Sequence, residues 1–148
     1  MSEGNCTPNV MRVMVDTNIL VSAALFREGS VSSILKEIMS DYDLCVCTFS
    51  LEELIIVFKR KFRYKMDDLD EFLRELTYEL IYTPLRIEKA GLPRIRDEKD
   101  YPILMSAMIA DIDVIVSGDK DLSCLDCERP EILAPSGFKE RYLSRHTG

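Results

Sequence analysis

The chain has 148 residues, of which 47% are hydrophobic, which is enough to bury one core and is usual for a single domain. A formal net charge of -7 argues against a general polyanion binder, because net repulsion opposes the approach to nucleic acid, so any such contact has to be local. No apolar run reaches the roughly 20 residues of a membrane-spanning helix, and the opening segment is too polar for a secretory signal. We therefore expect a soluble, cytoplasmic protein with no membrane contact.

The first half of the chain alternates short apolar runs with amphipathic stretches. Residues 1–9 are predicted to be a flexible tail, followed by one domain over residues 10–145. In chain order we expect a buried strand at Val10–Val15, a short helix from Ile19, a helix over Ser30–Met39 with Ser30 as its cap, a second buried strand at Leu44–Cys47, and a helix that opens at Ser50 and ends in a basic cluster.

The second half continues the alternation with weaker signals. We expect a helix from Asp67 or Asp68 through Leu80, a strand at Tyr82–Ile87 that Pro84 confines to a sheet edge, a helix at Asp100–Ala110, a strand at Val114–Val116, a weak strand at Ile132 and Leu133, and a helix from Phe138. Parallel strands need a helix between neighbours. The sequence therefore predicts a three-layer α/β fold with a central, mostly parallel sheet flanked by helices.

The five cysteines are an odd number, and Cys45 and Cys47 lie inside an apolar run, which favours free thiols over a disulfide framework. Cys124 and Cys127 have the spacing of half a zinc site, but no second pair of Cys or His residues completes four ligands. A structural zinc is therefore not expected.

Four acidic residues lie at boundaries of the predicted elements. Asp16 and Asp119 each follow a buried strand, and Glu53 and Asp100 lie in the first turns of helices. Ligands of parallel sheets gather at the carboxyl ends of the strands, so all four can point into one crevice. Crowded carboxylates repel one another unless a cation neutralises them, and oxygen ligands of this kind select Mg²⁺ or Mn²⁺.

Each of these acids also has an ordinary structural interpretation. Glu53 stands three residues after Ser50, which is the capping-box pattern. Asp100 can be a helix N-cap, and Asp119 with Asp121 can form a polar turn. These interpretations do not explain why four element boundaries all carry carboxylates, since Ser, Thr, Asn or Gly serve as well.

The only histidine, His146, lies near the end of the chain. A Ser or Cys nucleophile would lack its usual histidine base, and a zinc hydrolase would lack its imidazole ligands. Hydrolysis assisted by paired divalent cations remains as the chemistry of these carboxylates. Asn18, Ser117 and Asp97 are candidate partners of the ligands through hydrogen bonds or as outer acids.

A basic and aromatic cluster follows the helix that carries Glu53. It is the one candidate surface for RNA, because basic side chains contact phosphates and aromatic rings stack on bases. A solvated helix end is an equally good interpretation. The basic residues of this cluster are Lys59, Arg60, Lys61, Arg63 and Lys65.

The strings MVDTNILVSAAL, FSLEELIIVFKRKF, RDEKDYPILMSAM and DVIVSGDKDL, in this order, resemble the successive motifs of the PIN-domain family over residues 12 to 122. The resemblance is closest to the subgroup of toxins in toxin-antitoxin pairs. It implies a central parallel sheet, magnesium- or manganese-dependent cleavage of RNA, an antitoxin partner, and often a homodimer.

Matched by motif, the resemblance implies that the metal ligands are Asp16, Glu53, Asp100 and Asp119. Glu52 is a less favoured substitute for Glu53 from the same string. Asn18 and Ser117 match positions that orient the ligands, and Asp97 resembles an accessory acid of this subgroup. Asp121 is a further candidate accessory acid near the same elements, for which a solvated surface position is the favoured interpretation.

Three alternatives remain. A haloacid-dehalogenase-type phosphatase needs a second Asp where Asn18 stands, and a response-regulator receiver needs a Lys after a late strand, so both fit fewer strings. A non-catalytic module whose acidic crevice binds a basic segment of a partner is the alternative from another class.

Overall fold

The computed structural model describes residues 10–86, 100–119, 122 and 129–143. The predicted tail at residues 1–9, the accessory acids Asp97 and Asp121, and the pair Cys124 and Cys127 lie outside the described residues. Cys45 and Cys47 are both buried free thiols, as predicted.

Five parallel strands form one sheet in the order β3-β2-β1-β4-β5. They are β1 (Arg12–Val15), β2 (Asp43–Cys47), β3 (Glu79–Ile81), β4 (Val114–Val116) and β5 (Glu131–Leu133). The chain builds outward from β1 to β3 and then returns to the centre, so the order reverses between β1 and β4. The predicted α/β fold with a central parallel sheet is confirmed.

The helices connect these strands and cover the sheet. They are α1 (Thr17–Leu25), α2 (Ser30–Asp41), α3 (Thr48–Lys61), the short 3-10 turn η2 (Arg63–Lys65), α4 (Met66–Glu75), α5 (Tyr101–Ile109), and α7 (Pro135–Phe138), which continues as the π-helical turn η4 (Lys139–Leu143). None of the helices in the described part of the chain combines the length and the hydropathy of a membrane span.

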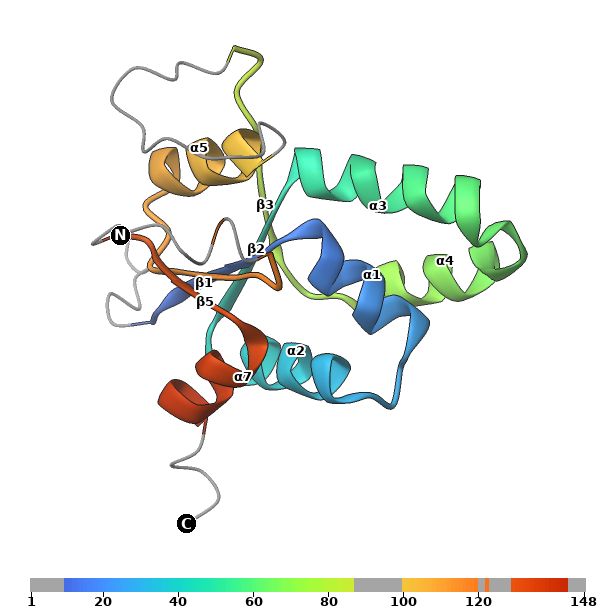
Figure 1. The fold of residues 1–148 in the computed structure, drawn as a ribbon, viewed down its shortest axis with the longest axis horizontal. Coiled ribbons are helices and arrows are strands. Elements are labelled where there is room, and N and C mark those ends of the chain that lie inside the picture. The colour runs from blue at the N-terminus through green and yellow to red at the C-terminus, as the bar shows by residue number, and fades with distance from the viewer. Residues whose placement is uncertain (1–9, 87–99, 120–121, 123–128, 144–148) are drawn as a thin grey trace, which may run out of the picture.

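The alternation of side chains along each strand divides the core into two clusters. Val13 and Val15 of β1 belong to the cluster formed with α1 to α4 and α7, whereas Met14 between them belongs to the cluster formed with α5. Figure 1 accordingly shows α5 apart from the group of α1 to α4. The sheet is therefore covered on both faces, which leaves its strand ends open for a site.

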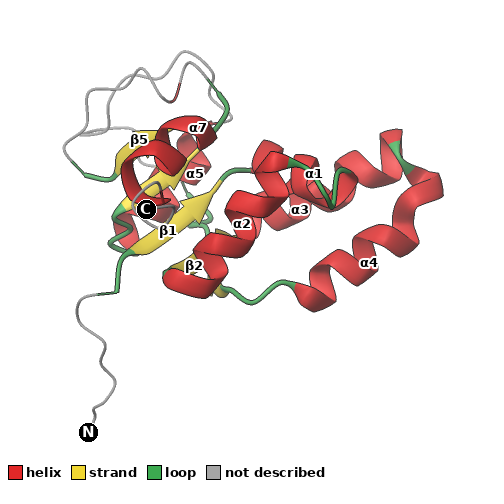
Figure 2. Cartoon of the chain, turned by 90° about the horizontal axis from the view of Figure 1, so that it is seen from below, coloured by secondary structure: helices red, strands yellow, loops and turns green. Residues whose placement is uncertain are grey.

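The helices α3 and α4 extend beyond the sheet and are joined by η2 at their far end (Figures 1 and 2). Leu54 and Phe58 on α3 and Leu69 and Phe72 on α4 are buried on the inner sides of this pair. The pair forms what we call the helical arm, residues 48–75.

Several predicted boundaries are wrong. The helix predicted to run through Leu80 ends at Glu75, and the edge strand lies at Glu79–Ile81, before the predicted range. Leu76 and Leu80 continue the helical spacing of α4, but the chain leaves the helix because Ile81 is buried in the sheet beside Cys47. The edge position of this strand is confirmed.

The two predicted serine caps are also wrong. Gly29 is the N-cap of α2, with Ser30 the first helical residue. Cys47 is the N-cap of α3, which therefore begins two residues before Ser50. The last helix begins at Pro135 and not at Phe138, because proline at the first position is well suited to start a helix.

Candidate active site

A pocket of about 220 Å³ opens at the carboxyl ends of β1, β2 and β4, where the strand order reverses. This is the position at which parallel sheets bind their ligands. Here it is called the acidic pocket. Its described lining consists of Asp16, Thr17, Asn18, Phe49, Glu53, Asp100, Ile103 and Asp119. The structure thus brings together the four carboxylates predicted from the sequence.

Asp16 follows β1 and is the N-cap of α1. Its Oδ1 accepts a hydrogen bond from the backbone N–H of Ile19 at 3.0 Å, and its Oδ2 accepts one from the hydroxyl of Ser117. Burial raises the pKa of Asp16, Asp119 raises it further, and the hydrogen bonds from Ser117 and Ile19 oppose the rise. A negative charge at Asp16 is therefore costly in the folded protein, although two donors hold its orientation.

Ser117 connects the ends of the two central strands. It is fully buried directly after β4, and its hydroxyl donates to Asp16 while accepting from the backbone N–H of Asp119 at 3.0 Å. One side chain thus fixes both the Asp16 carboxylate and the turn that carries Asp119. A hydrogen bond from Ser117 to one of these carboxylates was predicted, and the role of Asp16 as a metal ligand stays a prediction.

Glu53 lines the acidic pocket from α3. Because α3 begins at Thr48, Glu53 lies in the second turn and not the first, so Ser50 and Glu53 do not form the capping box. Ser50 is instead fully buried and accepts a hydrogen bond from the Cys47 thiol at 3.4 Å. The capping interpretation of Glu53 is therefore excluded. Glu52 lines a neighbouring pocket instead.

Asp100 occupies the N-cap position of α5 and is buried, with Pro102 following in the first turn. Its side chain makes no capping hydrogen bond to the amides of α5. Capping therefore does not account for a carboxylate here.

Three lining residues were not predicted: Thr17, Phe49 and Ile103. The Thr17 hydroxyl is buried and has no hydrogen-bond partner among the described residues. Thr17 and Asn18 share the Asp-Thr-Asn string with Asp16, and this adjacency was the available signal for Thr17. Phe49 and Ile103 give no such signal, because their apolar side chains read as core.

The donor set fits a hard divalent cation. Carboxylates, an amide and a hydroxyl supply the oxygen ligands that Mg²⁺ and Mn²⁺ prefer, and the described lining includes neither Cys nor His. Within residues 10–86, 100–119, 122 and 129–143, however, no three acidic, Cys or His side chains are close enough to hold one ion. The described acids share a pocket without forming a coordination shell.

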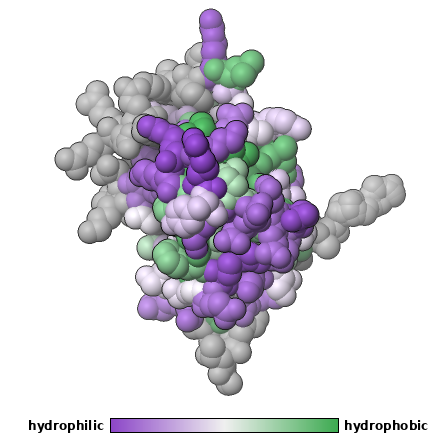
Figure 3. All heavy atoms as spheres, turned by 90° about the vertical axis from the view of Figure 1, so that its right-hand side faces the viewer, coloured by the Kyte–Doolittle hydropathy of each residue, from purple (hydrophilic) through white to green (hydrophobic). Residues whose placement is uncertain are grey.

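The predicted RNA-binding cluster lies at the far end of the helical arm. Lys59, Arg60 and Lys61 are exposed in the last turn of α3, Arg63 is exposed in η2, and Lys65 is half-buried. The face of the molecule at this end is mainly hydrophilic (Figure 3). Acidic residues of α4 follow directly, so the arm carries charges of both signs.

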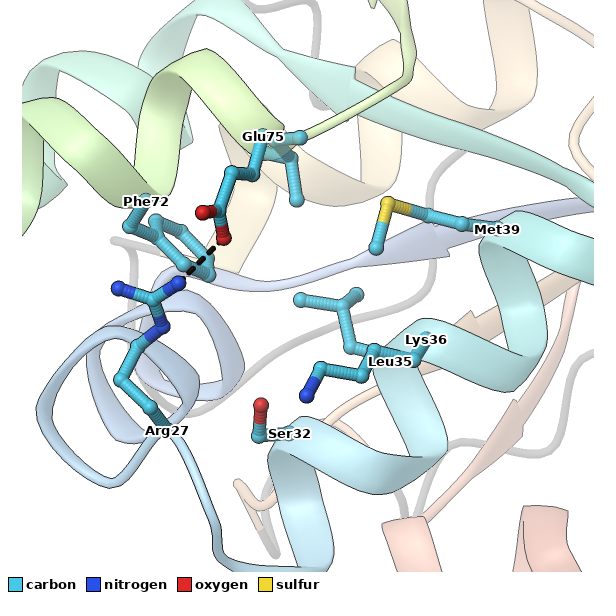
Figure 4. Close-up of a pocket in the computed structure, with 8 residues that line it drawn as sticks. Arg27, Ser32, Leu35, Lys36, Met39, Phe72 and Glu75 are labelled. Carbon is cyan, nitrogen blue, oxygen red and sulfur yellow. Dashed lines mark hydrogen bonds and ion pairs between the residues drawn. The ribbon is translucent and has the colours of Figure 1, made fainter.

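A further small pocket lies between α1, α2 and α4 (Figure 4). Arg27 pairs with Glu75 across its opening and with Glu71 at 3.6 Å. Its volume of about 30 Å³ is far below that of ordinary small-molecule sites, which is roughly 300 Å³ or more. It is therefore a packing gap closed by an ion pair.

Comparison with known proteins agrees with the motif resemblance to the PIN-domain family. The family model described as the PIN domain matches residues 12–121. Comparison with curated protein sequences gives no match.

A solved structure with a similar fold is that of VapBC2 from Rickettsia felis bound to a DNA fragment from their promoter. The match has a TM-score of 0.61 at 21% sequence identity and covers 83% of this chain and 97% of that chain. At this identity the likeness concerns the fold alone.

Proposed function

The chain belongs to the PIN domain family, and from this premise we propose that it is a divalent-metal-dependent endoribonuclease that hydrolyses phosphodiester bonds of single-stranded RNA. PIN domains are typically metal-dependent nucleases. The observation that carries the proposal is that Asp16, Glu53, Asp100 and Asp119, from four separate elements, line one pocket.

A divalent ion bound among these acids would polarise the phosphate, lower the pKa of the attacking water and stabilise the charge of the departing oxygen. Residues of the chain orient the carboxylates that would bind the ion. Ser117 and the Ile19 amide hold one lone pair of each Asp16 oxygen, which leaves the others available. Phe49 and Ile103 form the apolar part of the lining.

RNA reaches this pocket along α3 in our proposal. Arg60 follows Glu53 by seven residues, so it lies on the same side of the helix, roughly 10 Å along the axis. A phosphate bound by Arg60 would therefore lie on the same RNA strand as the scissile phosphate. Lys59, Lys61, Arg63 and Lys65 add positive charge around this point, although the net charge of the protein is -7.

We further propose that the chain is the toxin of a toxin-antitoxin pair, with an antitoxin as its partner protein. This proposal is supported by the likeness of fold to a chain of VapBC2 and by the resemblance of the motifs to those of PIN-domain toxins. A homodimer is the assembly that the resemblance implies, and it stays a prediction.

The test of the catalytic proposal is cleavage of single-stranded RNA by the purified chain. We expect cleavage with Mg²⁺ or Mn²⁺, none with a chelator, and a loss of at least about 100-fold in Asp119→Asn, whose melting temperature in the chelator should equal that of the wild type. Asp113→Asn is the matched control, because Asp113 lies at the opposite edge of the sheet. Full activity in the chelator would contradict the proposal.

The test of the RNA path is the salt dependence of RNA binding. Arg60→Gln is expected to lower the slope of log affinity against log salt by about 1, since one phosphate contact is lost. Lys36→Gln is the control, because Lys36 is an exposed lysine on α2. Equal slopes in the two variants would move the RNA path away from α3.

A further inference from the structure

A second pocket lies beside the acidic pocket at the same edge of the sheet. It has a volume of about 300 Å³ and is lined by Thr48, Phe49, Glu52, Thr83, Pro84, Leu85 and Pro102. We call it the Phe49 pocket. Phe49 also lines the acidic pocket, so the two pockets adjoin. The Phe49 pocket lies over the ends of β2 and β3, whereas the acidic pocket lies over β1, β2 and β4.

Hydrogen bonds between three elements hold the Phe49 pocket in shape. The Thr83 hydroxyl accepts from the backbone N–H of Phe49 at 3.1 Å and from the Ser106 hydroxyl at 2.9 Å. The backbone N–H of Thr83 donates to the Thr48 hydroxyl at 3.0 Å. The chain after β3 is thereby tied to α3 and α5, and Figure 1 shows the start of α3 and α5 on either side of β3.

The lining suits a flat, neutral, partly apolar group. Phe49, Pro84 and Leu85 supply apolar surface, and Leu85 is fully exposed at 105%. Glu52 is the only charged residue in the described lining, so a phosphate would be repelled. A base of single-stranded RNA offers the required chemistry, because its faces stack on aromatic and apolar side chains and its edge carries N–H donors.

We infer that the Phe49 pocket binds the base of the nucleotide next to the scissile phosphate, and that Glu52 selects guanine there. The inference rests on the proposed ribonuclease function. A carboxylate accepts hydrogen bonds and cannot donate, and its two oxygens match two adjacent donors. Guanine presents such a pair on its Watson–Crick edge, at N1–H and the exocyclic amine. Neighbouring strands lie about 5 Å apart, so the two pockets are separated by the scale of one nucleotide step.

The experiment compares single-stranded RNA oligomers that differ only in the nucleotide on either side of the cut. Binding is measured by fluorescence anisotropy with Asp119→Asn in the presence of Mg²⁺, so that the RNA stays intact. We expect guanine at one position to bind at least about tenfold more tightly than the other bases. Adding Glu52→Gln should reduce this preference to about twofold or less, since an amide no longer accepts on both atoms.

Two further variants separate recognition from folding. Glu37→Gln, at an exposed position of α2, is the matched control and should keep the full preference for guanine. Phe49→Leu should weaken binding of all four bases by roughly tenfold while keeping the preference, because stacking does not depend on the base. A uniform loss for all bases in Glu52→Gln would overturn the inference, since it would show a general effect and not selection.

Binding and cleavage together distinguish the two proposals. A guanine preference that depends on Glu52, without cleavage by the wild type, would overturn the proposed ribonuclease activity and support guanine binding in the Phe49 pocket. Metal-dependent cleavage with equal binding of all four bases would support the proposed ribonuclease activity and overturn guanine binding in the Phe49 pocket.

Discussion

The two edges of the parallel sheet handle acidic residues in opposite ways. At the amino edge three acids pair with arginines: Glu79 with Arg12 at 2.7 Å, Asp113 with Arg129 at 2.9 Å, and Glu131 with Arg141 at 2.6 Å. At the carboxyl edge the acids share a pocket whose described lining includes neither Arg nor Lys.

The difference teaches which acids serve the fold. The three amino-edge acids form ion pairs with arginines of the same chain. The Asp113 carboxylate also accepts a hydrogen bond from the backbone N–H of Arg12 at 2.8 Å. They satisfy charges and backbone groups locally. The carboxyl-edge acids concentrate negative charge at the point where the strand order reverses, and Asp119 raises the pKa of the already buried Asp16. Such an edge is suited to a cation from solution.

The largest expected effect is the response of the carboxyl edge to Mn²⁺. At a hundredfold excess over Kd, an ion that binds only the folded state adds about 2.7 kcal/mol, or roughly 5 to 10 °C in Tm. The wild type should show this rise in a thermal melt, and Asp16→Asn should not. The amino-edge variant Asp113→Asn should keep it, and an equal shift in all three would break the distinction between the edges.

The next largest effect is expected on the free energy of unfolding when the half-buried guanidinium of Arg12 is removed from the amino edge. Arg12 bonds Glu79 and the carbonyl oxygen of Ala110, and its side chain is only 26% exposed. Arg12→Ala should lower the free energy of unfolding by about 1 to 3 kcal/mol, measured by urea denaturation. Cleavage per folded molecule should not change. A variant that folds normally but loses activity would show that the amino edge takes part in function.

Asp16→Asn should have the opposite effect on stability. Because the folded pKa of Asp16 is raised above its ordinary value of 3.8, the folded state binds the proton more tightly, and the wild type loses stability as the pH rises through the folded pKa. Asparagine keeps the N-cap without the charge. In a chelator the variant should match the wild type below pH 3.8 and exceed it at pH 7 by about 1 kcal/mol.

The smallest effect is expected for Asp113→Asn. Its partner Arg129 is 56% exposed, so the pair is screened by solvent, and the change in stability should be within about 1 kcal/mol. Unlike Asp16→Asn, it should be a loss. A gain in stability at pH 7 would show that the amino-edge acids also repel one another.

Sequence patterns predicted the parts of the fold that depend on neighbours along the chain. The strands at Leu44–Cys47 and Val114–Val116 were predicted because each is an apolar run that the sheet buries on both faces. The end of α4 was not, because Leu76 and Leu80 keep the helical spacing while pairing with β2 decides that Glu79 begins a strand.

The chemistry of the acidic positions was likewise set by the sequence. Residue type alone determined a hard-oxygen donor set, because the chain has a single histidine and its acids follow predicted strands or begin predicted helices. Only the tertiary structure decided what each acidic side chain meets. Glu52 and Glu53 are adjacent in sequence, yet they line different pockets because successive residues of a helix point about 100° apart. Periodicity fixes the angle between two side chains, but the packing of α3 against the sheet fixes what each one meets.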